Sequence, residues 1–232
     1  MTLRIGFDLD GVLADMDSAL VHQAEALFGE KLTRRREKLA IARATNPRTT
    51  DSIPDQHPPA GPLNLTTRQH RRLWRHVATI ENFWQTLREI EPGAVKRLAA
   101  VAAARRWEVI FLTKRPATAG RSAQVQSQRW LVSKGFERPS VCVVQGSRGL
   151  IAAALDLDVV VDDRHDNCYD VVVDSSARAL LVWREDGQQL PAAAERLGVG
   201  VVRTVGECLD ILASLDTPGR ADVAGDVPPA TF

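Results

Sequence analysis

Short apolar segments alternate with longer amphipathic segments along most of the chain. Runs that are apolar on both faces predict buried strands, and they span residues 3–9, 107–113, 140–145, 158–163, 178–184 and 199–205. Segments with apolar residues at helical spacing predict helices, and they span residues 16–29, 66–87, 94–106, 118–136, 147–157 and 206–215. Strands that are apolar on both faces and alternate with helices are typical of a parallel sheet covered on both sides. We therefore predict an α/β fold with a Rossmann-like parallel sheet and helices on both of its faces.

A loop-rich region interrupts this alternation after the first helix. Residues 31–65 contain five prolines and few long apolar periods, which disfavours regular structure there. We predict that residues 1–15 and 91–215 form the core, and that residues 16–90 form a helical cap inserted after the first strand. Residues 216–232, rich in Gly, Pro, Asp and Ala, are expected to be a disordered tail.

Polar side chains stand at the ends of three predicted strands. Asp8 and Asp10 follow the first strand, Thr113 ends the second, and Asp162 and Asp163 end the fourth. The carboxyl ends of parallel strands meet at one edge of the sheet, where open α/β sheets bind their ligands. We expect these five side chains to converge in one crevice.

The four aspartates predict the chemistry of that crevice. Ionised carboxylates cannot lie together unpaired without a large energetic cost. A Mg²⁺ ion would remove this repulsion, because it prefers carboxylates, water and phosphate oxygens as ligands. The predicted metal ligands are Asp8, Asp10, Asp162 and Asp163. The segments LTKRP (112–116) and GSRG (146–149) place cations near the same edge, so we predict a phosphate-binding site that includes Thr113, Lys114 and Arg148.

The pair Asp8 and Asp10 can divide the catalytic work. Residues two apart in an extended segment point the same way. One carboxylate can attack phosphorus while the other transfers protons to the leaving alcohol and from water, which combines nucleophilic with general acid–base catalysis. Gly11 permits a tight turn directly after the pair.

Three motifs resemble those of a known family. FDLDGVLAD (7–15) resembles the first motif of the haloacid dehalogenase-like phosphohydrolases, FLT (111–113) the second and VVVDD (159–163) the fourth. The resemblance covers most of residues 1–215. It implies that Asp8 is the nucleophile that forms an aspartyl-phosphate, and that Asp10 is the acid/base and gives its backbone carbonyl to Mg²⁺. It also implies that Thr113 binds the phosphoryl group and that Asp162 and Asp163 hold the metal.

The third motif of this family is usually a lysine, and here the sequence departs from the pattern. The aligned position is Arg148, and Lys134 in VSKGF is the other candidate. Arginine keeps the charge and can bind phosphate with two donors, although it is bulkier than an ammonium group. A narrower resemblance, carried by residues 81–101 and by VDDRHDN (161–167), is to the 5′(3′)-deoxyribonucleotidase-like branch.

These features predict a Mg²⁺-dependent phosphomonoester hydrolase that acts on a nucleotide or another small phosphorylated metabolite. Two alternatives remain. A nucleic-acid end-processing phosphatase is suggested by residues 34–76, which contain ten basic and three acidic residues. A non-catalytic phosphate-binding regulatory module is suggested by the missing lysine.

The roles of several large side chains are also open. We expect Lys114 and Arg115 to be charges at the rim rather than catalytic groups. Phe83 and Trp84 are expected to pack the junction between cap and core.

The composition of the chain argues against several classes of partner and site. Hydrophobic residues make up 44% and charged residues 25%, as in ordinary soluble proteins, and the net charge of +1 indicates no global polyanion partner. Three separated cysteines without a CxxC pair disfavour a zinc site or a disulfide framework and fit a reducing cytoplasm. No segment predicts a signal peptide or a membrane span, so we expect a cytoplasmic protein without a membrane partner. The oligomeric state is left open.

Overall fold

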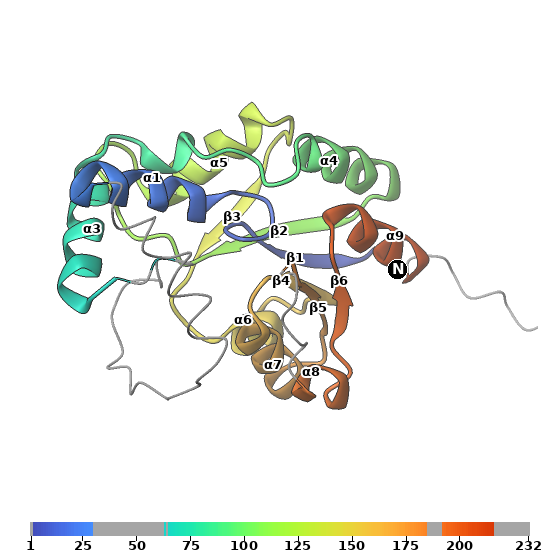
Figure 1. Cartoon of the computed structure of the whole chain (residues 1–232). Coiled ribbons are helices and arrows are strands. Elements are labelled where there is room, and N and C mark those ends of the chain that lie inside the picture. The colour runs from blue at the N-terminus through green and yellow to red at the C-terminus, as the bar shows by residue number, and fades with distance from the viewer. Residues whose placement is uncertain (1, 30–62, 64, 185–191, 216–232) are drawn as a thin grey trace, which may run out of the picture.

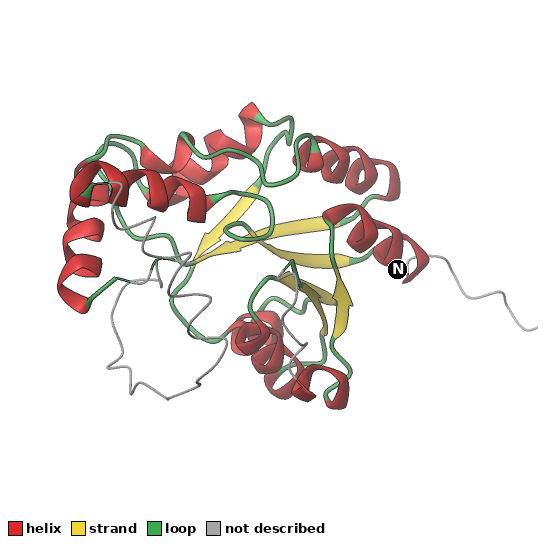
Figure 2. Ribbon diagram, viewed as in Figure 1, coloured by secondary structure: helices red, strands yellow, loops and turns green. Residues whose placement is uncertain are grey.

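Six parallel strands form the centre of the molecule (Figures 1 and 2). The computed structural model describes residues 2–29, 63, 65–184 and 192–215. The strand order is β3-β2-β1-β4-β5-β6, and every pair of neighbours is parallel. The strands are β1 (Arg4–Asp8), β2 (Glu108–Thr113), β3 (Ser140–Val143), β4 (Val159–Asp162), β5 (Arg178–Val182) and β6 (Gly200–Val202). The predicted fold class is confirmed.

Helices cover both faces of this sheet, as Figure 1 shows. One face carries α1 (Met16–Phe28), α4 (Ala94–Arg105), α5 (Ala123–Ser133) and α9 (Val205–Leu215). The other face carries α6 (Arg148–Ala154), α7 (His165–Asp174) and α8 (Ala192–Arg196). Successive strand residues alternate between the two apolar clusters, so that Phe111 packs into the first and Leu112 into the second. Both faces are buried, which explains why the strands are apolar throughout.

The helices expected to form a cap pack on the first of these clusters. Leu20 of α1, Leu73 of α3 (Thr67–Thr79) and Trp84 of the 3₁₀ turn η1 (Phe83–Gln85) belong to the same apolar cluster as Phe7 of β1. Phe83 is buried there as well, while the expectation that Phe83 and Trp84 pack a junction between cap and core depends on that division. The division into core and cap itself stays a prediction.

The helix predicted over 66–87 begins where expected but ends early. A capping box between Thr66 and Gln69 starts α3, which ends at Thr79. Asn82 then adopts a left-handed conformation with φ of 52°. Its backbone N–H donates to the carbonyl of Ala119, and its side chain accepts from the N–H of Arg121, at 2.8 and 3.0 Å. These long-range bonds redirect the chain, which explains why helical periodicity alone predicted too long a helix.

The helix α7 was not predicted. Its sequence HDNCYDVVVD combines β-branched and short polar residues that are weak helix formers. Tertiary packing decides here, because Cys168 and Val171 are buried in the second apolar cluster. Most of the loop-rich region 31–65 and the whole segment 216–232 lie outside the described residues, and so do the predictions made for them. Among the described helices, none combines the length and apolarity needed to cross a membrane.

Candidate active site

The first strand delivers its aspartates into a tight turn at the carboxyl edge of the sheet. Asp8 is the last residue of β1 and is 7% exposed. The N–H groups of Leu13 and Ala14 both donate to the carbonyl of Leu9, at 2.9 and 2.7 Å, which folds the chain back immediately. Gly11 lies in this turn with φ of 85°, a conformation that favours glycine.

A buried arginine joins the first strand to the fourth. Arg148, the first residue of α6, is 1% exposed; its Nη2 donates to Asp8 Oδ1, and its Nε donates to Asp162 Oδ2 at 3.2 Å. Ser147 caps the start of this helix, since its hydroxyl accepts from two backbone N–H groups. Lys134 instead lies at the C-terminal end of α5. Of the two candidates for the cation of the third motif, Arg148 is therefore the residue that contacts Asp8.

This cluster perturbs the acid–base properties of its members. Burial and the charge of Asp162 raise the pKa of Asp8 well above its ordinary value, although Arg148 opposes the shift. Burial alone would lower the pKa of Arg148, but the two carboxylates more than compensate and raise it. Arg148 therefore stays protonated.

Asp162 is held by a full set of hydrogen bonds. It is fully buried, and besides Arg148 it accepts from the backbone N–H of Arg164 at 2.9 Å. The side-chain amide of Asn167 donates to both of its oxygens, at 2.9 and 3.0 Å. Asn167 lies on α7, the helix that sequence reasoning missed, and the motif VDDRHDN was the only signal for it. With both oxygens occupied, Asp162 orients Arg148.

Asp10 is paired with a second arginine. Arg115 Nε lies 3.1 and 2.9 Å from the two oxygens of Asp10, and Nη2 lies 2.7 Å from Oδ1. The hydroxyl of Thr113 donates to Asp10 Oδ2 at 3.1 Å. The expectation that Arg115 is a rim charge is wrong, because its side chain is fully buried. Thr113 lies beside Asp10 as the strand-end argument required.

Lys114 lies close enough to the cluster to respond to its charges. Partial burial lowers the pKa of Lys114, with the charges of Arg148 and Arg164 acting in the same direction and those of Asp162 and Asp8 opposing it. A partly desolvated ammonium group at this position can bind an anionic group.

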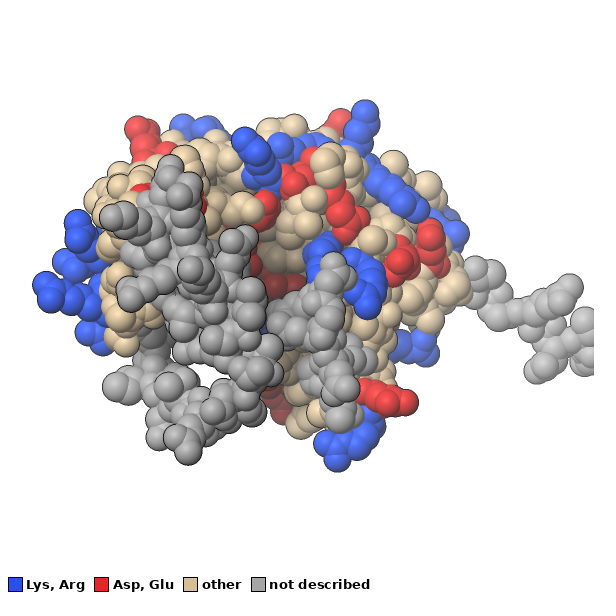
Figure 3. Space-filling view, in the orientation of Figure 1, with Lys and Arg blue, Asp and Glu red and all other residues tan. Residues whose placement is uncertain are grey.

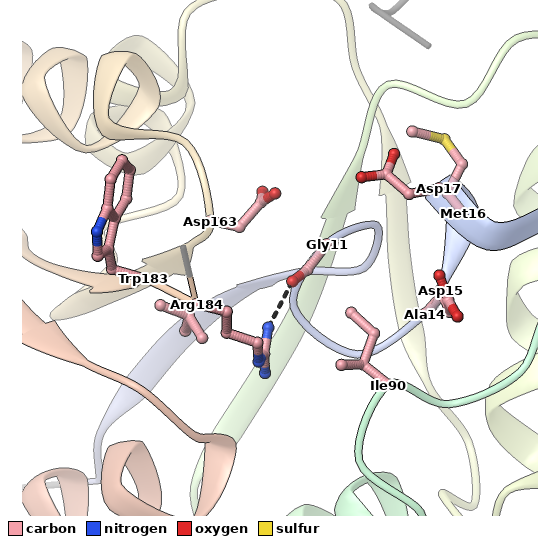
Figure 4. A pocket seen from close by; sticks show the side chains of 10 residues that line it. Gly11, Ala14, Asp15, Met16, Asp17, Ile90, Asp163, Trp183 and Arg184 are labelled. Carbon is pink, nitrogen blue, oxygen red and sulfur yellow. Dashed lines mark hydrogen bonds between the residues drawn. The ribbon is translucent and has the colours of Figure 1, made fainter. Parts of the chain in front are cut away.

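Asp163 lies across the turn from these groups. Together with Gly11, Asp17, Trp183 and Arg184, it lines a cavity of about 300 Å³ between the turn after β1 and the end of β5, shown in Figure 4. Burial and the charge of Asp162 raise the pKa of Asp163 to about 8, and Asp17 acts in the same direction. A cation at this position would stabilise the ionised form.

Arg184 fixes the far side of the turn. Its Nη1 donates to the carbonyl of Gly11 at 2.6 Å, and its Nη2 donates to the carbonyl of Val12 at 3.2 Å, the first of which Figure 4 draws. Nη2 also pairs with Glu91 at 2.5 Å. Sequence reasoning treated Arg184 only as the end of a strand and gave it no role.

The close contact between Gly11 and Asp163 allows a stability test. A Cβ at Gly11 would lie 1.9 Å from Asp163 Oδ2, whereas one at Gly29, which has a similar φ, would meet no described residue within 4 Å. Both Gly11→Ala and Gly29→Ala should cost about 1–2 kcal/mol of backbone strain. Gly11→Ala should cost roughly 1–3 kcal/mol more from overpacking, measured by urea denaturation. Equal losses in the two variants would show that the contact with Asp163 is not tight.

The donor set can be compared with the needs of Mg²⁺. In the described part of the chain, no three Asp, Glu, His or Cys side chains form a ready-made metal-binding group. The repulsion among the aspartates, from which we predicted a divalent cation, is relieved in part by Arg148 and Arg115. No lysine or arginine of the described chain forms an ion pair with Asp163, and Arg148 bonds only Oδ1 of Asp8. The carboxylate of Asp163 and the second oxygen of Asp8 are hard oxygen donors of the kind that Mg²⁺ prefers.

Comparison with known proteins gave matches of structure only. No protein-family model matches the sequence, and no curated protein matches it. A Thermotoga maritima protein assigned as a β-phosphoglucomutase is 17% identical, with a TM-score of 0.55 over 92% of this chain and 100% of that one. A haloacid dehalogenase-like hydrolase from Streptococcus pneumoniae is 12% identical, with a TM-score of 0.51 over 91% and 98%. A dehalogenase is 16% identical, with a TM-score of 0.51 over 91% and 97%. The chain therefore has the fold of the haloacid dehalogenase-like hydrolases.

Proposed function

We propose that this protein is a Mg²⁺-dependent phosphomonoester hydrolase that acts through an aspartyl-phosphate on Asp8. The observation that carries the proposal is the buried bridge from Arg148 to Asp8 and Asp162 at the carboxyl edge of the sheet. This bridge places the cationic Arg148 beside the carboxylate of Asp8. Asp10 and Thr113, which are hydrogen-bonded to each other, lie near the same strand ends.

Two steps account for the reaction. Asp8 attacks phosphorus as the bond from phosphorus to the leaving oxygen breaks, and the carboxylic acid of Asp10 gives its proton to that oxygen. Water then attacks the aspartyl-phosphate and gives a proton to Asp10, which releases inorganic phosphate and restores Asp8.

The chain supplies charge for both steps. Arg148 and Lys114 bind phosphoryl oxygens, and Asp162 orients Arg148 through the bonds described above. Bound Mg²⁺, held by Asp8, Asp163 and the backbone carbonyl of Asp10, would screen charge and polarise the phosphoryl group. In this assignment Asp163 is the direct ligand of the fourth motif.

The proposed metal site should change how the stability of the protein depends on pH. Because burial raises the pKa of Asp163 from 3.8 to about 8, the folded state binds more protons than the unfolded state between these values. Without Mg²⁺, stability should therefore fall as the pH rises through that range. Mg²⁺ needs ionised ligands, so it should raise the thermal midpoint more at pH 8.5 than at pH 6. Asp163→Asn should weaken both effects, and an unchanged pH slope in this variant would contradict the assignment.

The substrate is proposed to be a nucleotide or another small phosphorylated metabolite. A panel of nucleotides, sugar phosphates and p-nitrophenyl phosphate, assayed for phosphate release with Mg²⁺ and with EDTA, tests this. We expect Mg²⁺-dependent turnover of at least one class. Absence of turnover across the panel would favour a non-catalytic phosphate-binding module. That alternative was suggested by the missing lysine of the third motif, and Arg148 supplies a cation in its place. Halide release from a 2-haloacid without any phosphate release would also overturn the proposal.

A second candidate is a nucleic-acid end-processing phosphatase, and one surface favours it. The helix α3 exposes Arg68, Arg71, Arg72 and Arg75 and contains no acidic residue. Basic side chains gather at that side of the molecule in Figure 3. A single-stranded oligonucleotide with a terminal phosphate belongs in the panel for this reason. Preferential turnover of this oligonucleotide, with affinity that falls steeply as salt rises, would select this candidate over a metabolite phosphatase.

A further inference from the structure

Arg115 is an arginine in the interior of the protein. Its side chain is fully buried, whereas the side chain of Asp10, with which it pairs, is 13% exposed. It lies two residues after Thr113, in the segment that leaves the second strand for α5. Burying a guanidinium group is costly, and buried ion pairs often add little to stability. Its position therefore calls for another explanation.

The contacts of Arg115 fix the orientation of the Asp10 carboxylate. Nε and Nη2 together engage Oδ1 at 3.1 and 2.7 Å, and Nε also lies 2.9 Å from Oδ2. The Thr113 hydroxyl bonds Oδ2 from another direction. A planar guanidinium that contacts both oxygens defines the plane of a carboxylate, which a single ammonium donor cannot do.

Arg115 is itself held in place from three sides. Its Nη1 donates to the hydroxyl of Ser127 on α5 at 2.9 Å. The ring centroids of Trp84 and Trp130 lie 5.0 and 5.9 Å from its guanidinium carbon. Both indoles are anchored in turn, since Trp84 donates to the carbonyl of Pro116 and Trp130 to that of Leu87, at 3.0 and 2.8 Å. A rotation of the guanidinium group would break several of these contacts at once.

From this arrangement we propose that Arg115 is a positioning residue for the acid/base Asp10. It holds the carboxyl group where a proton can pass to the leaving oxygen and later be taken from water. The inference rests on the proposed phosphatase function and adds a residue that none of the sequence motifs assigned. Arg115 acts through Asp10, so its loss should reproduce the loss of Asp10.

Leaving-group dependence provides the readout. Proton donation matters most for alkyl phosphates, whose leaving groups are poor, and least for p-nitrophenyl phosphate. Arg115→Met should lower kcat/KM for an alkyl phosphate roughly 10²-fold, because a small misplacement of a catalytic group has effects of this size. The loss of kcat/KM for p-nitrophenyl phosphate should be much smaller, because kcat/KM covers only the steps up to formation of the aspartyl-phosphate. Arg115→Lys keeps a charge without the planar fork, so it should restore only part of the rate.

A double-mutant cycle separates positioning from a general structural role. In the Asp10→Asn background, Arg115→Met should cause little further loss of kcat, because the group that it positions is absent. Arg129→Met, at an exposed arginine of α5, is the matched control and should leave kcat unchanged. Urea denaturation of each variant verifies that it is folded.

The outcomes distinguish the inference from the function on which it rests. Equal losses from Arg115→Met in the wild-type and Asp10→Asn backgrounds, or equal losses of kcat/KM for good and poor leaving groups, would overturn the inference alone. Unfolding of Arg115→Met would shift the test to Arg115→Lys, and the same criteria apply to that variant. A wild-type protein that hydrolyses no phosphate ester would overturn the proposed function and the inference together.

Discussion

Replacing Asp8 with asparagine is expected to abolish phosphate release. The carboxamide keeps the size of the side chain but cannot form the aspartyl-phosphate, so kcat should fall by roughly 10³-fold or more. Asp8 is buried against Arg148 at the end of the central strand β1. The measurement is phosphate release from the best substrate of the panel.

Two further observations make this test specific. Mass spectrometry of acid-quenched wild-type enzyme should detect a phosphoryl adduct on the peptide that contains Asp8, and the Asp8→Asn variant should lack it. Asp210→Asn is the matched control, because Asp210 is an exposed residue of α9 that pairs with Arg97. Full turnover in Asp8→Asn together with a phosphoryl adduct on another residue would show that the nucleophile is misassigned.

Removing Arg148 is expected to have the largest effect on stability. Arg148→Met leaves the carboxylates of Asp8 and Asp162 buried without their shared cation. Breaking one side of such a buried pair typically costs about 3–5 kcal/mol. Without Arg148, which opposes the upward shift, the pKa of Asp8 should rise further. The loss of stability should therefore be smaller at pH 5, where Asp8 can take up a proton, than at pH 8.

Urea denaturation at the two pH values measures this loss. Arg148→Lys keeps a cation but cannot bond both carboxylates in the same way, so an intermediate stability is expected. Arg97→Met removes an arginine from an exposed ion pair and should change stability by less than about 1 kcal/mol. A free energy of unfolding that is unaltered by Arg148→Met at pH 8 would show that the bridge contributes nothing to folding.

The features that sequence could predict are those that depend on local pattern. Apolar strands alternating with helices predicted the parallel sheet, and the polar residues at strand ends predicted that Asp8, Asp10 and Thr113 gather at one edge. Both inferences need only periodicity and the rule that parallel strands share a carboxyl edge. The helix α7 was missed because its residues favour helix only when packed against the second apolar cluster.

The surroundings of Asp10 could not be predicted in this way. In LTKRP, two successive basic residues before a proline suggest a surface turn, and nothing in the segment indicates burial. Arg115 is buried because Trp84 and Trp130, from distant parts of the chain, enclose it, and because Asp10 accepts its hydrogen bonds. Such tertiary contacts have no local signal. The four clustered aspartates likewise predicted a cation between them. They gave no sign that Arg148 and Arg115 supply part of the positive charge.

The central place of β1 in the sheet has a consequence for motion. This strand is hydrogen-bonded to β2 on one side and to β4 on the other. Local opening of a protein usually begins at its edges and loops, whereas a central strand is released only when most of the domain unfolds. Asp8 is therefore carried by a segment whose amide protons should exchange with solvent among the slowest in the chain.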